Sequence, residues 1–213
     1  MSDYVGLLLA AGRSLRFGAD KLLHPLPDGT PVALASARAL LSGVPRVLAL
    51  VNGDNPELES LLREAGLELV VVSDREDGMG TSLATGVAAS PPADGWIVAL
   101  ADMPFIQPET VARVRGALAA GAPLAAPYYQ GRRGHPVGFS RRFQAELLTL
   151  AGDTGARTVL EGHLEDLVRL DCADPGVLLD IDTPQDLDRR FRPDNATLAN
   201  TSEESGTSCP PFE

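Results

Sequence analysis

Near-continuous apolar runs alternate with amphipathic segments through the first half of this chain, and this alternation limits the fold more than any other feature. The runs are rich in Val, Leu and Ile, and they cover residues 4–11, 46–52, 67–73 and 96–102. Between them lie three segments with the apolar spacing and the Pro and Gly boundaries of helices, at 32–43, 56–66 and 81–90. Continuous apolar runs are typical of strands buried on both faces of a parallel sheet. The alternation therefore predicts an α/β fold with a mainly parallel, doubly wound sheet and helices on both faces.

The second half of the chain follows this plan less regularly. Helices are expected over 108–121 and 141–152, and strands over 122–129 and 134–140. A strand, a turn and a capped helix are expected over 177–191. A further short helix is expected to have Asp153 as its cap.

The composition changes after Phe191. Residues 192–213 are rich in Ser, Thr, Asn, Glu and Pro and have no apolar periodicity. Because such a segment cannot bury enough apolar surface to fold alone, we expect a disordered tail. Residues 1–191 are long enough for one well-buried core and are predicted to form a single domain.

The charge and the termini restrict the partners and the compartment. A formal net charge of −11 disfavours a nucleic-acid or anionic-membrane surface, so a polyanionic ligand must be met by a local cationic pocket. The two cysteines are too few for a disulfide framework or a zinc site. The sequence has neither a basic leader nor a stretch of about 20 apolar residues. These features predict a cytoplasmic protein.

The first apolar run leads directly into a loop of glycines and positive charges, LLLAAGRSLRFGADKLL (residues 7–23). Glycines such as Gly12 let backbone amides approach phosphate oxygens, and Arg13, Arg16 and Lys21 add positive charge. At the carboxyl edge of a parallel sheet, this loop is predicted to bind phosphate, although a solvated turn is an alternative. The glycine spacing fits neither the Walker loop nor the dinucleotide fingerprint, which argues against a nicotinamide oxidoreductase.

Lys21 is the one lysine among 18 cationic residues, and the other 17 are arginines. An ammonium is a compact point charge that can lie among several phosphate oxygens, whereas a guanidinium is planar and forked. The retention of lysine at this position indicates that an ammonium is needed there, with chance placement as the alternative.

Acidic residues follow two predicted strands. Asp102 comes directly after an apolar strand, so its carboxylate is expected near the glycine loop, where it is a natural ligand for Mg²⁺. Asp180 and Asp182 alternate with apolar residues and are expected on one side of their strand. Helix capping is the alternative role for Asp102. The alternative for Asp182 is that Asp182 or Thr183 caps the following helix.

Six motifs occur in a fixed order over residues 5–191: LLLAAGRSLRFGADKLL, DGMGTSLATG, ADMPFI, GRRGHPVGF, GDTGAR and DIDTPQDL. Together they resemble the nucleotidyltransferases of molybdenum cofactor maturation, most closely the molybdenum cofactor cytidylyltransferases. The resemblance implies a Rossmann-like nucleotidyltransferase fold. It also implies transfer of CMP from CTP to the terminal phosphate of molybdopterin, with release of pyrophosphate and with Mg²⁺ as cofactor.

The resemblance further implies roles for individual residues. Arg16, Lys21 and Asp102 are expected to carry catalysis, and Asp102 and Asp182 to hold Mg²⁺. The residues expected to bind the nucleotide are Ala10, Ala11, Gly12, Arg13, Ser14, Arg16, Lys21, Gly80 and Ser82. The residues expected to face the pterin substrate are Arg133, Gly134, His135 and Pro136.

Physical reasoning agrees with these roles, because attack of one phosphate on another brings two anions together. The protein must then position and neutralise charge rather than supply a nucleophile. His135 is expected to be a packed structural histidine, with a proton carrier as the alternative. Arg157 is expected to be exposed, with phosphate binding as the alternative.

The choice of nucleotide and acceptor rests on fewer residues. Ala10, Ala11 and Gly12 occupy the positions where guanylyl relatives tend to have Ala-Gly-Gly. The added methyl group of Ala11, together with Ser14, narrows the base pocket and favours cytidine. Two other readings stay open. One is nucleotidyl transfer to another phosphorylated small molecule, and the other is a non-catalytic protein that delivers molybdenum cofactor to a molybdenum hydroxylase.

Truncation after Phe191 should change neither the melting temperature nor the activity appreciably, because the removed segment lacks apolar residues that could dock on the domain. Thermal unfolding and turnover of the truncated and full chains provide the comparison. A large drop in either quantity would mean that the tail folds onto the domain or onto a partner.

Overall fold

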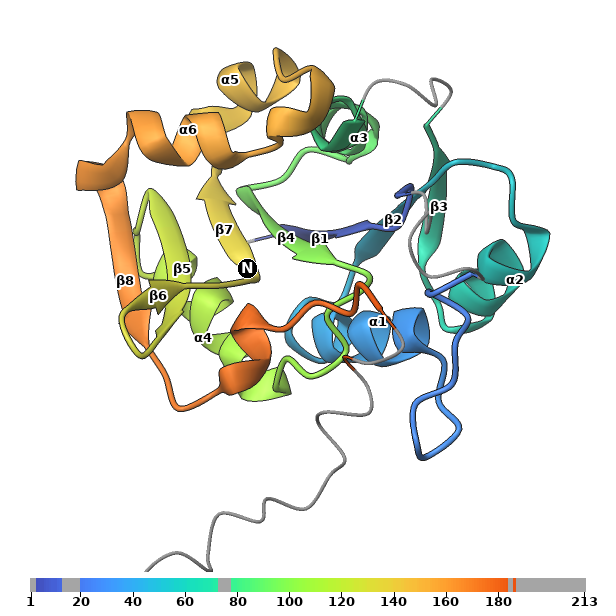
Figure 1. Ribbon diagram of the computed structural model, residues 1–213. Helices are drawn as coiled ribbons and strands as arrows, with labels where there is room; N and C mark the ends of the chain where they lie inside the picture. The colour runs from blue at the N-terminus through green and yellow to red at the C-terminus, as the bar shows by residue number, and fades with distance from the viewer. Residues whose placement is uncertain (1–2, 13–19, 73–77, 184–185, 187–213) are drawn as a thin grey trace, which may run out of the picture.

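An eight-stranded mixed sheet separates two layers of helices (Figure 1). This computed structural model describes residues 3–12, 20–72, 78–183 and 186. The strand order is β3-β2-β1-β4-β7-β5-β6, and β8 pairs with β5. The strands are β1 (Tyr4–Leu9), β2 (Val47–Val51), β3 (Glu68–Val71), β4 (Gly95–Leu100), β5 (Leu124–Tyr129), β6 (Arg132–Arg133), β7 (Val137–Ser140) and β8 (Leu167–Asp171).

Most of the strand pairs are parallel. β1 runs parallel to β2 and β4, β2 to β3, and β5 to β8. β7 is antiparallel to both of its neighbours, β4 and β5, and β6 is antiparallel to β5. The predicted mainly parallel, doubly wound sheet is therefore confirmed, with one reversed strand inserted between β4 and β5.

Helices cover both faces of the sheet (Figure 1). One layer contains α1 (Val32–Gly43), α2 (Pro56–Glu64) and α4 (Pro108–Ala119), and the other contains α3 (Gly78–Ala89), α5 (Gln144–Leu148) and α6 (Arg157–Gly162). Four short 3₁₀ helices complete the described elements: η1 (Arg141–Phe143), η2 (Gly152–Thr154), η3 (Leu164–Asp166) and η4 (Pro175–Leu178). Within these residues, no helix combines the length and apolarity needed to cross a bilayer.

Two apolar cores result, one on each face of the sheet. Successive residues of β1 point in opposite directions, so Leu7 packs in the core with α3 and α5 while Leu8 packs in the core with α1 and α4. Both side chains are fully buried. This two-sided burial explains why the central strands read as continuous apolar runs.

The strand expected near residue 177 does not form. Residues 175–178 make η4 instead, because Pro175 favours a helical start and Asp174 caps it by accepting a hydrogen bond from the Gly176 amide at 2.9 Å. The following residues 179–183 lie outside the described strands. Ile181 still reaches the sheet edge, where its amide donates to the Asp102 carbonyl at 2.9 Å. The helix predicted after Thr183 falls mostly outside the described residues, as does the predicted tail.

Two other local expectations need correction. Asp153 does not cap α6, which begins after Ala156 without a side-chain cap; Asp153 lies in η2 instead. β8 was not predicted, since Val168 and Arg169 are exposed and its sequence LVRLD has no continuous apolar run.

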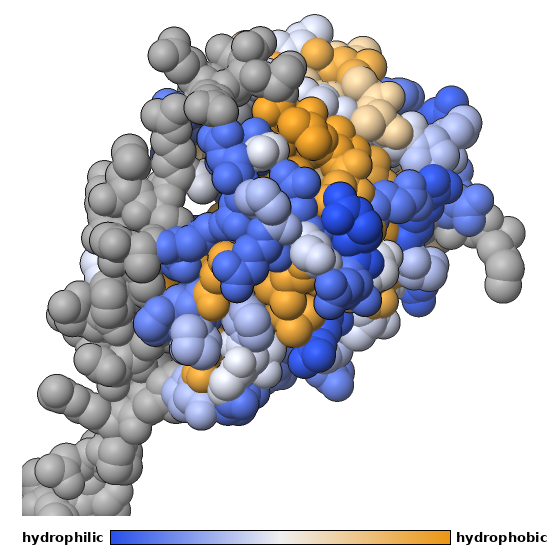
Figure 2. Space-filling model, turned by 90° about the vertical axis from the view of Figure 1, so that its right-hand side faces the viewer, coloured by the Kyte–Doolittle hydropathy of each residue, from blue (hydrophilic) through white to orange (hydrophobic). Residues whose placement is uncertain are grey.

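The edge of the sheet at β3 is partly open to solvent. β3 pairs only with β2 among the described strands, and the Val71 side chain is 56% exposed. Figure 2 views the molecule from this side and shows hydrophobic surface among hydrophilic residues. The polar groups discussed below gather elsewhere, at the carboxyl ends of β1 and β4.

Candidate active site

The order of the strands creates a crevice where β1 and β4 end. β1 lies between β2 and β4, and the chain continues from β1 to β2 and from β4 to β5, which lie toward opposite edges of the sheet. The last residues of the two strands, Leu9 and Leu100, are paired in register. Open α/β sheets bind ligands at such a point, outside the carboxyl ends of the strands. Ala10, Ala11 and Gly12 leave β1 here, and Asp102 follows β4.

A lysine joins two carboxylates at this crevice. The Lys21 ammonium donates to Asp102 Oδ2 at 2.7 Å and to Asp182 Oδ1 at 3.1 Å. The side chains of Lys21 and Asp102 are 15% and 23% exposed, whereas Asp182 is 52% exposed. Lys21 therefore lies largely inside the crevice, and the structure brings together three of the residues that the sequence singled out.

The charged groups of this cluster shift one another's pKa values. Burial alone would lower the pKa of Lys21, but its ion pairs with Asp102 and Asp182 outweigh burial and raise the pKa. Partial desolvation raises the pKa of Asp180, and the negative charges of Asp182 and Asp102 raise it further. Lys21 is therefore firmly cationic, and the carboxylates around it repel one another when it is removed.

Hydrogen bonds from three segments of the chain fix the backbone around Asp102. The Ala101 amide donates to the Leu9 carbonyl at 3.0 Å, and Ser36 Oγ of α1 donates to the Ala101 carbonyl at 2.9 Å. Ser36 is buried, and sequence reasoning did not single it out because a serine inside an apolar helix has no distinctive pattern. With the contact from Ile181, these bonds leave the Asp102 backbone little freedom.

The turn that carries Lys21 is fixed to two helices. The Leu22 carbonyl accepts from the Ala33 amide at 2.9 Å, which ties the turn to α1. Asp20 Oδ1 accepts from the Leu22 amide at 3.0 Å, and Asp20 Oδ2 accepts from the side-chain amide of Asn55. Asn55 also caps α2, as its position before Pro56 would have indicated.

The carboxylates have donor atoms suited to a divalent cation. Asp102 Oδ1 is buried and has no hydrogen-bond partner among the described residues, while Asp102 Oδ2 faces the Lys21 charge. Mg²⁺ and Mn²⁺ favour carboxylate oxygens of this kind. Asp102 and Asp182 therefore have the donor atoms that the expected metal-binding role needs.

A cavity of about 650 Å³ lies beside the crevice. Its apolar wall includes Leu9, Leu83, Val98 and Leu100, and its polar residues include Arg133 and Arg157. Arg157 is exposed and pairs with Glu161 at 2.6 Å. A cavity of this size fits a small organic substrate. Its lining combines the apolar wall with two cationic residues and two acidic ones, Asp153 and Glu161.

The segment before β7 borders this cavity. Gly134 and His135 line it, and Pro136 is buried next to them. The Gly134 amide donates to the Pro127 carbonyl at 2.9 Å, and a Cβ on Gly134 would collide with the Val177 carbonyl oxygen. Glycine is therefore required here by close packing of the backbone.

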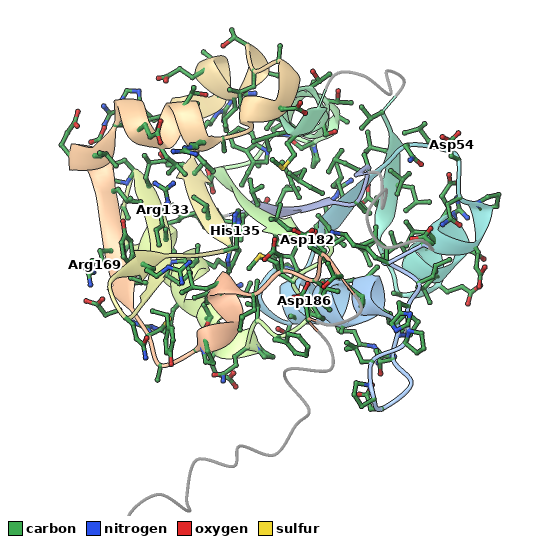
Figure 3. The ribbon with its side chains drawn as sticks, viewed as in Figure 1. Asp54, Arg133, His135, Arg169, Asp182 and Asp186 are labelled. Carbon is green, nitrogen blue, oxygen red and sulfur yellow. The ribbon has the colours of Figure 1, made fainter. Side chains whose placement is uncertain are left out.

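His135 is held as a neutral ring. Burial lowers its pKa, with a smaller lowering contribution from Arg133, while Asp102 and a hydrogen bond to the Val98 backbone oppose the shift. Its Nδ1 is buried and has no hydrogen-bond partner among the described residues. Figure 3 shows His135 and Asp182 toward the middle of the molecule, whereas Arg169 lies at the outer edge with β8.

The remaining expected nucleotide contacts divide into two groups. At the start of α3, Gly80 packs against the carbonyl oxygens of Ala151 and Gly152, where a Cβ would approach each to 2.8 Å. Ser82 is buried, and its hydroxyl donates to the Gly78 carbonyl at 3.2 Å. The other group, Arg13, Ser14 and Arg16, lies outside the described residues.

One protein-family model and several curated proteins match this chain. A family model described as "MobA-like NTP transferase domain" matches residues 6–168. The chain is 34% identical to the purine catabolism protein PucB of Bacillus subtilis, over 86% of this chain and 94% of the relative. It is 35% identical to the nicotine blue oxidoreductase of Paenarthrobacter nicotinovorans, with the same coverage of both chains.

Solved structures with the same fold include nucleotidyltransferases. The crystal structure of Rv0371c from Mycobacterium tuberculosis in complex with manganese has a TM-score of 0.70 and 28% identity, over 88% of this chain and 97% of the other. A nucleotidyl transferase from Methanothermobacter, Mth528, has a TM-score of 0.75 and 25% identity, over 88% and 95% of the two chains.

Replacing Lys21 by Met should lower the free energy of unfolding by about 1–2 kcal/mol at neutral pH, because Asp102 then lies partly buried beside Asp182 without a counter-charge. Denaturant unfolding without divalent cations measures the change. The matched variant Asp182→Asn should cost less, since Asp182 is more exposed. Equal stability of Lys21→Met and wild type would contradict a structural role for this ion pair.

Proposed function

Since the chain belongs to the MobA-like NTP transferase family, we propose that it transfers CMP from CTP to the terminal phosphate of molybdopterin and releases pyrophosphate. Nucleotidyl transfer is the activity of the family. The cytidine nucleotide and the molybdopterin acceptor are the specific part of the proposal. The observation that carries it is the Lys21 ammonium between two carboxylates, at the ligand-binding edge of the sheet and beside a cavity.

The proposed reaction is an in-line displacement. An oxygen of the acceptor phosphate attacks the α-phosphorus of the triphosphate, a new P–O bond forms, and the bond to the β-phosphate oxygen breaks. Both reactants are anions, so the chain's main tasks are to orient them and to neutralise charge. Lys21 is placed to interact with phosphate oxygens, and Gly12 has open space beside it through which a phosphate can approach its backbone. Arg16 is proposed to add a second positive charge.

Asp102 and Asp182 are proposed to hold a divalent cation. The unpartnered Oδ1 of Asp102 supports this assignment, as does the manganese of the Rv0371c structure. Mg²⁺ is the ion we propose, and when bound it neutralises phosphate charge. The chain's own carboxylates would fix its place relative to Lys21, so that the triphosphate meets positive charge from two sides.

The pterin part of the acceptor is proposed to occupy the cavity beside the crevice. Val98 and Leu100 of β4 lead from its apolar wall directly to Asp102, so an acceptor there would have its phosphate near the metal carboxylates. Arg133 offers positive charge at this wall, and Gly134 and His135 line it, with Pro136 buried next to them. Gly80 and Ser82 are proposed to face the nucleotide from α3.

The preference for cytidine is proposed from the floor of the nucleotide site. Ala10 is buried and Ala11 half-buried where they leave β1, so a methyl group stands at a position where guanylyl relatives tend to have glycine. Less room remains for a base, which favours a pyrimidine over a purine. Delivery of the cytidylated cofactor to a molybdenum hydroxylase would be consistent with the proposed reaction.

The direct test is pyrophosphate release with each of the four nucleoside triphosphates, with and without molybdopterin. Release should require molybdopterin and Mg²⁺ and should be faster with CTP than with GTP. Equal rates with both would refute the base preference and leave the reaction class intact. Release only with another phosphorylated acceptor would replace molybdopterin. Tight molybdenum cofactor binding without release, or NADH oxidation without release, would contradict nucleotidyl transfer.

Replacing Asp102 by Asn should abolish transfer while leaving the fold intact, because the side chain keeps its volume but loses the charge proposed to hold the metal. Steady-state pyrophosphate release at saturating Mg²⁺ measures the loss, and circular dichroism checks the fold. Asp171→Asn on β8 is the control, since Asp171 is exposed and outside the site. Near-normal turnover of Asp102→Asn would overturn the metal assignment.

Replacing Lys21 by Arg should lower turnover at least tenfold, a barrier increase of roughly 1.4 kcal/mol. The guanidinium keeps the charge but is broader than the ammonium, and it would displace the phosphates in a crevice where Lys21 is only 15% exposed. Pyrophosphate release by Lys21→Arg, Lys21→Ala and wild type makes the comparison. Wild-type turnover with arginine would mean that lysine is accidental at this position.

A further inference from the structure

One buried carboxylate lies outside the crevice and has no role in the site so far. Asp174 is 2% exposed, and within the described residues it is the only Asp, Glu, Lys or Arg that is buried. Its hydrogen bonds come from neutral groups. The Gln107 amide and the Thr110 hydroxyl donate to Oδ2 at 2.9 and 2.7 Å, and the Gly176 amide donates to Oδ1 at 2.9 Å. Burial of a charged group is unfavourable, and these three bonds offset that cost.

The Asp174 carboxylate joins two segments of the chain that lead to or from the crevice. Gln107 and Thr110 belong to the first segment, which starts at Asp102 and runs into the first turn of α4. Gly176 belongs to the second segment, which starts with η4 and continues toward Asp182. One side chain therefore caps the start of α4 and the start of η4 at the same time.

Close packing and a further hydrogen bond continue this connection toward the crevice. A Cβ on Gly176 would collide with the Phe105 carbonyl oxygen, so glycine lets η4 lie directly against the backbone of the first segment. Nearer the crevice, the Ile181 amide donates to the Asp102 carbonyl at 2.9 Å. The two segments are thus joined at three places along their length.

We propose that Asp174 is a positioning residue that holds Asp182 beside Asp102. Its carboxylate fixes the two segments relative to each other, and the bond from Ile181 extends that arrangement to the crevice. The Lys21 ammonium can then contact both crevice carboxylates at once. The functional part rests on the proposed role of these carboxylates as metal ligands. Loss of groups that orient metal ligands typically changes metal affinity by roughly 10–100-fold.

A carboxylate is the group that this position needs. It has two acceptor oxygens and no donor, so it can accept from both segments. An amide has one acceptor oxygen, and its NH₂ group would face an N–H or O–H donor in either orientation. Asp174→Asn therefore keeps the size of the side chain but loses the bond to one of the two segments.

Amide hydrogen exchange of the full, metal-free chain tests the link. In Asp174→Asn the Ile181 amide should exchange about tenfold faster or more, relative to the Gly6 amide of β1. The control Ser90→Ala also removes a hydrogen-bond partner, that of Trp96 Nε1, near the other end of β4, and it should leave this ratio unchanged. An unchanged ratio in Asp174→Asn would make Asp174 a local cap and overturn the proposal.

Metal binding to matched variants tests the positioning role. Mn²⁺ titration followed by electron paramagnetic resonance should show a loss of affinity of about tenfold or more in Asp174→Asn and near wild-type affinity in Ser90→Ala. Thr110→Val removes one donor to the carboxylate and should also weaken binding, whereas Thr110→Ser keeps the hydroxyl and should preserve it. Wild-type affinity in Asp174→Asn, or equal affinities of the two Thr110 variants, would overturn the role.

The outcomes for this proposal and for the proposed function are distinguishable. If CTP and molybdopterin give no pyrophosphate release while Asp174→Asn still weakens Mn²⁺ binding, the reaction is refuted and the positioning role is retained. If release occurs and Asp174→Asn binds Mn²⁺ like wild type, the reaction is retained and the positioning role is refuted. If Asp174→Asn does not fold, Thr110→Val and Thr110→Ser decide the exchange at Ile181 and the metal affinity.

Discussion

The Lys21 ammonium holds together carboxylates that come from distant parts of the chain. Asp102 follows β4, and Asp182 lies near the end of the described residues, 161 positions after Lys21. Without a positive charge between them, these groups would repel each other in a partly buried crevice. The crevice therefore depends on a cation, and a phosphate ligand that attracts Lys21 would have to leave other positive charge in its place. In the proposed function, this dependence would link binding of the triphosphate to binding of a divalent cation by Asp102 and Asp182.

The surrounding structure holds these three side chains in position relative to one another. Ser36 fixes the backbone before Asp102, Asn55 fixes the turn of Lys21 through Asp20, and Ile181 brings the last segment to the sheet edge. Each contact comes from a different element of the same helical layer or from the chain that follows it. A site assembled in this way has positions set by the core, and only its loops remain to adapt to substrate.

The sequence predicted the clustering of Lys21, Asp102 and Asp182 better than it predicted the elements that support them. Lys21 and Asp102 could be identified because charged residues directly after apolar strands must lie at the sheet edge. Asp182 lies beside them, as the family resemblance implied. The strand expected to carry it is absent, because Asp174 and Pro175 favour a 3₁₀ helix. Ser36 and Asn55 could not be assigned to the site, since their partners are fixed only by tertiary packing. β8 was missed because pairing with β5, rather than its own apolarity, makes it a strand.

The reversed direction of β7 has a consequence for how such a site can diversify. The parallel strands contribute to the crevice only through the loops that follow them, but an antiparallel strand begins where they end. The hairpin before β7 therefore delivers the His135 segment to the crevice from the opposite chain direction. Changes in that hairpin can alter the cavity wall without changing the length or path of the loops that carry Lys21 and Asp102. In the proposed function, acceptor choice and phosphate chemistry would therefore depend on separate segments that share one sheet edge.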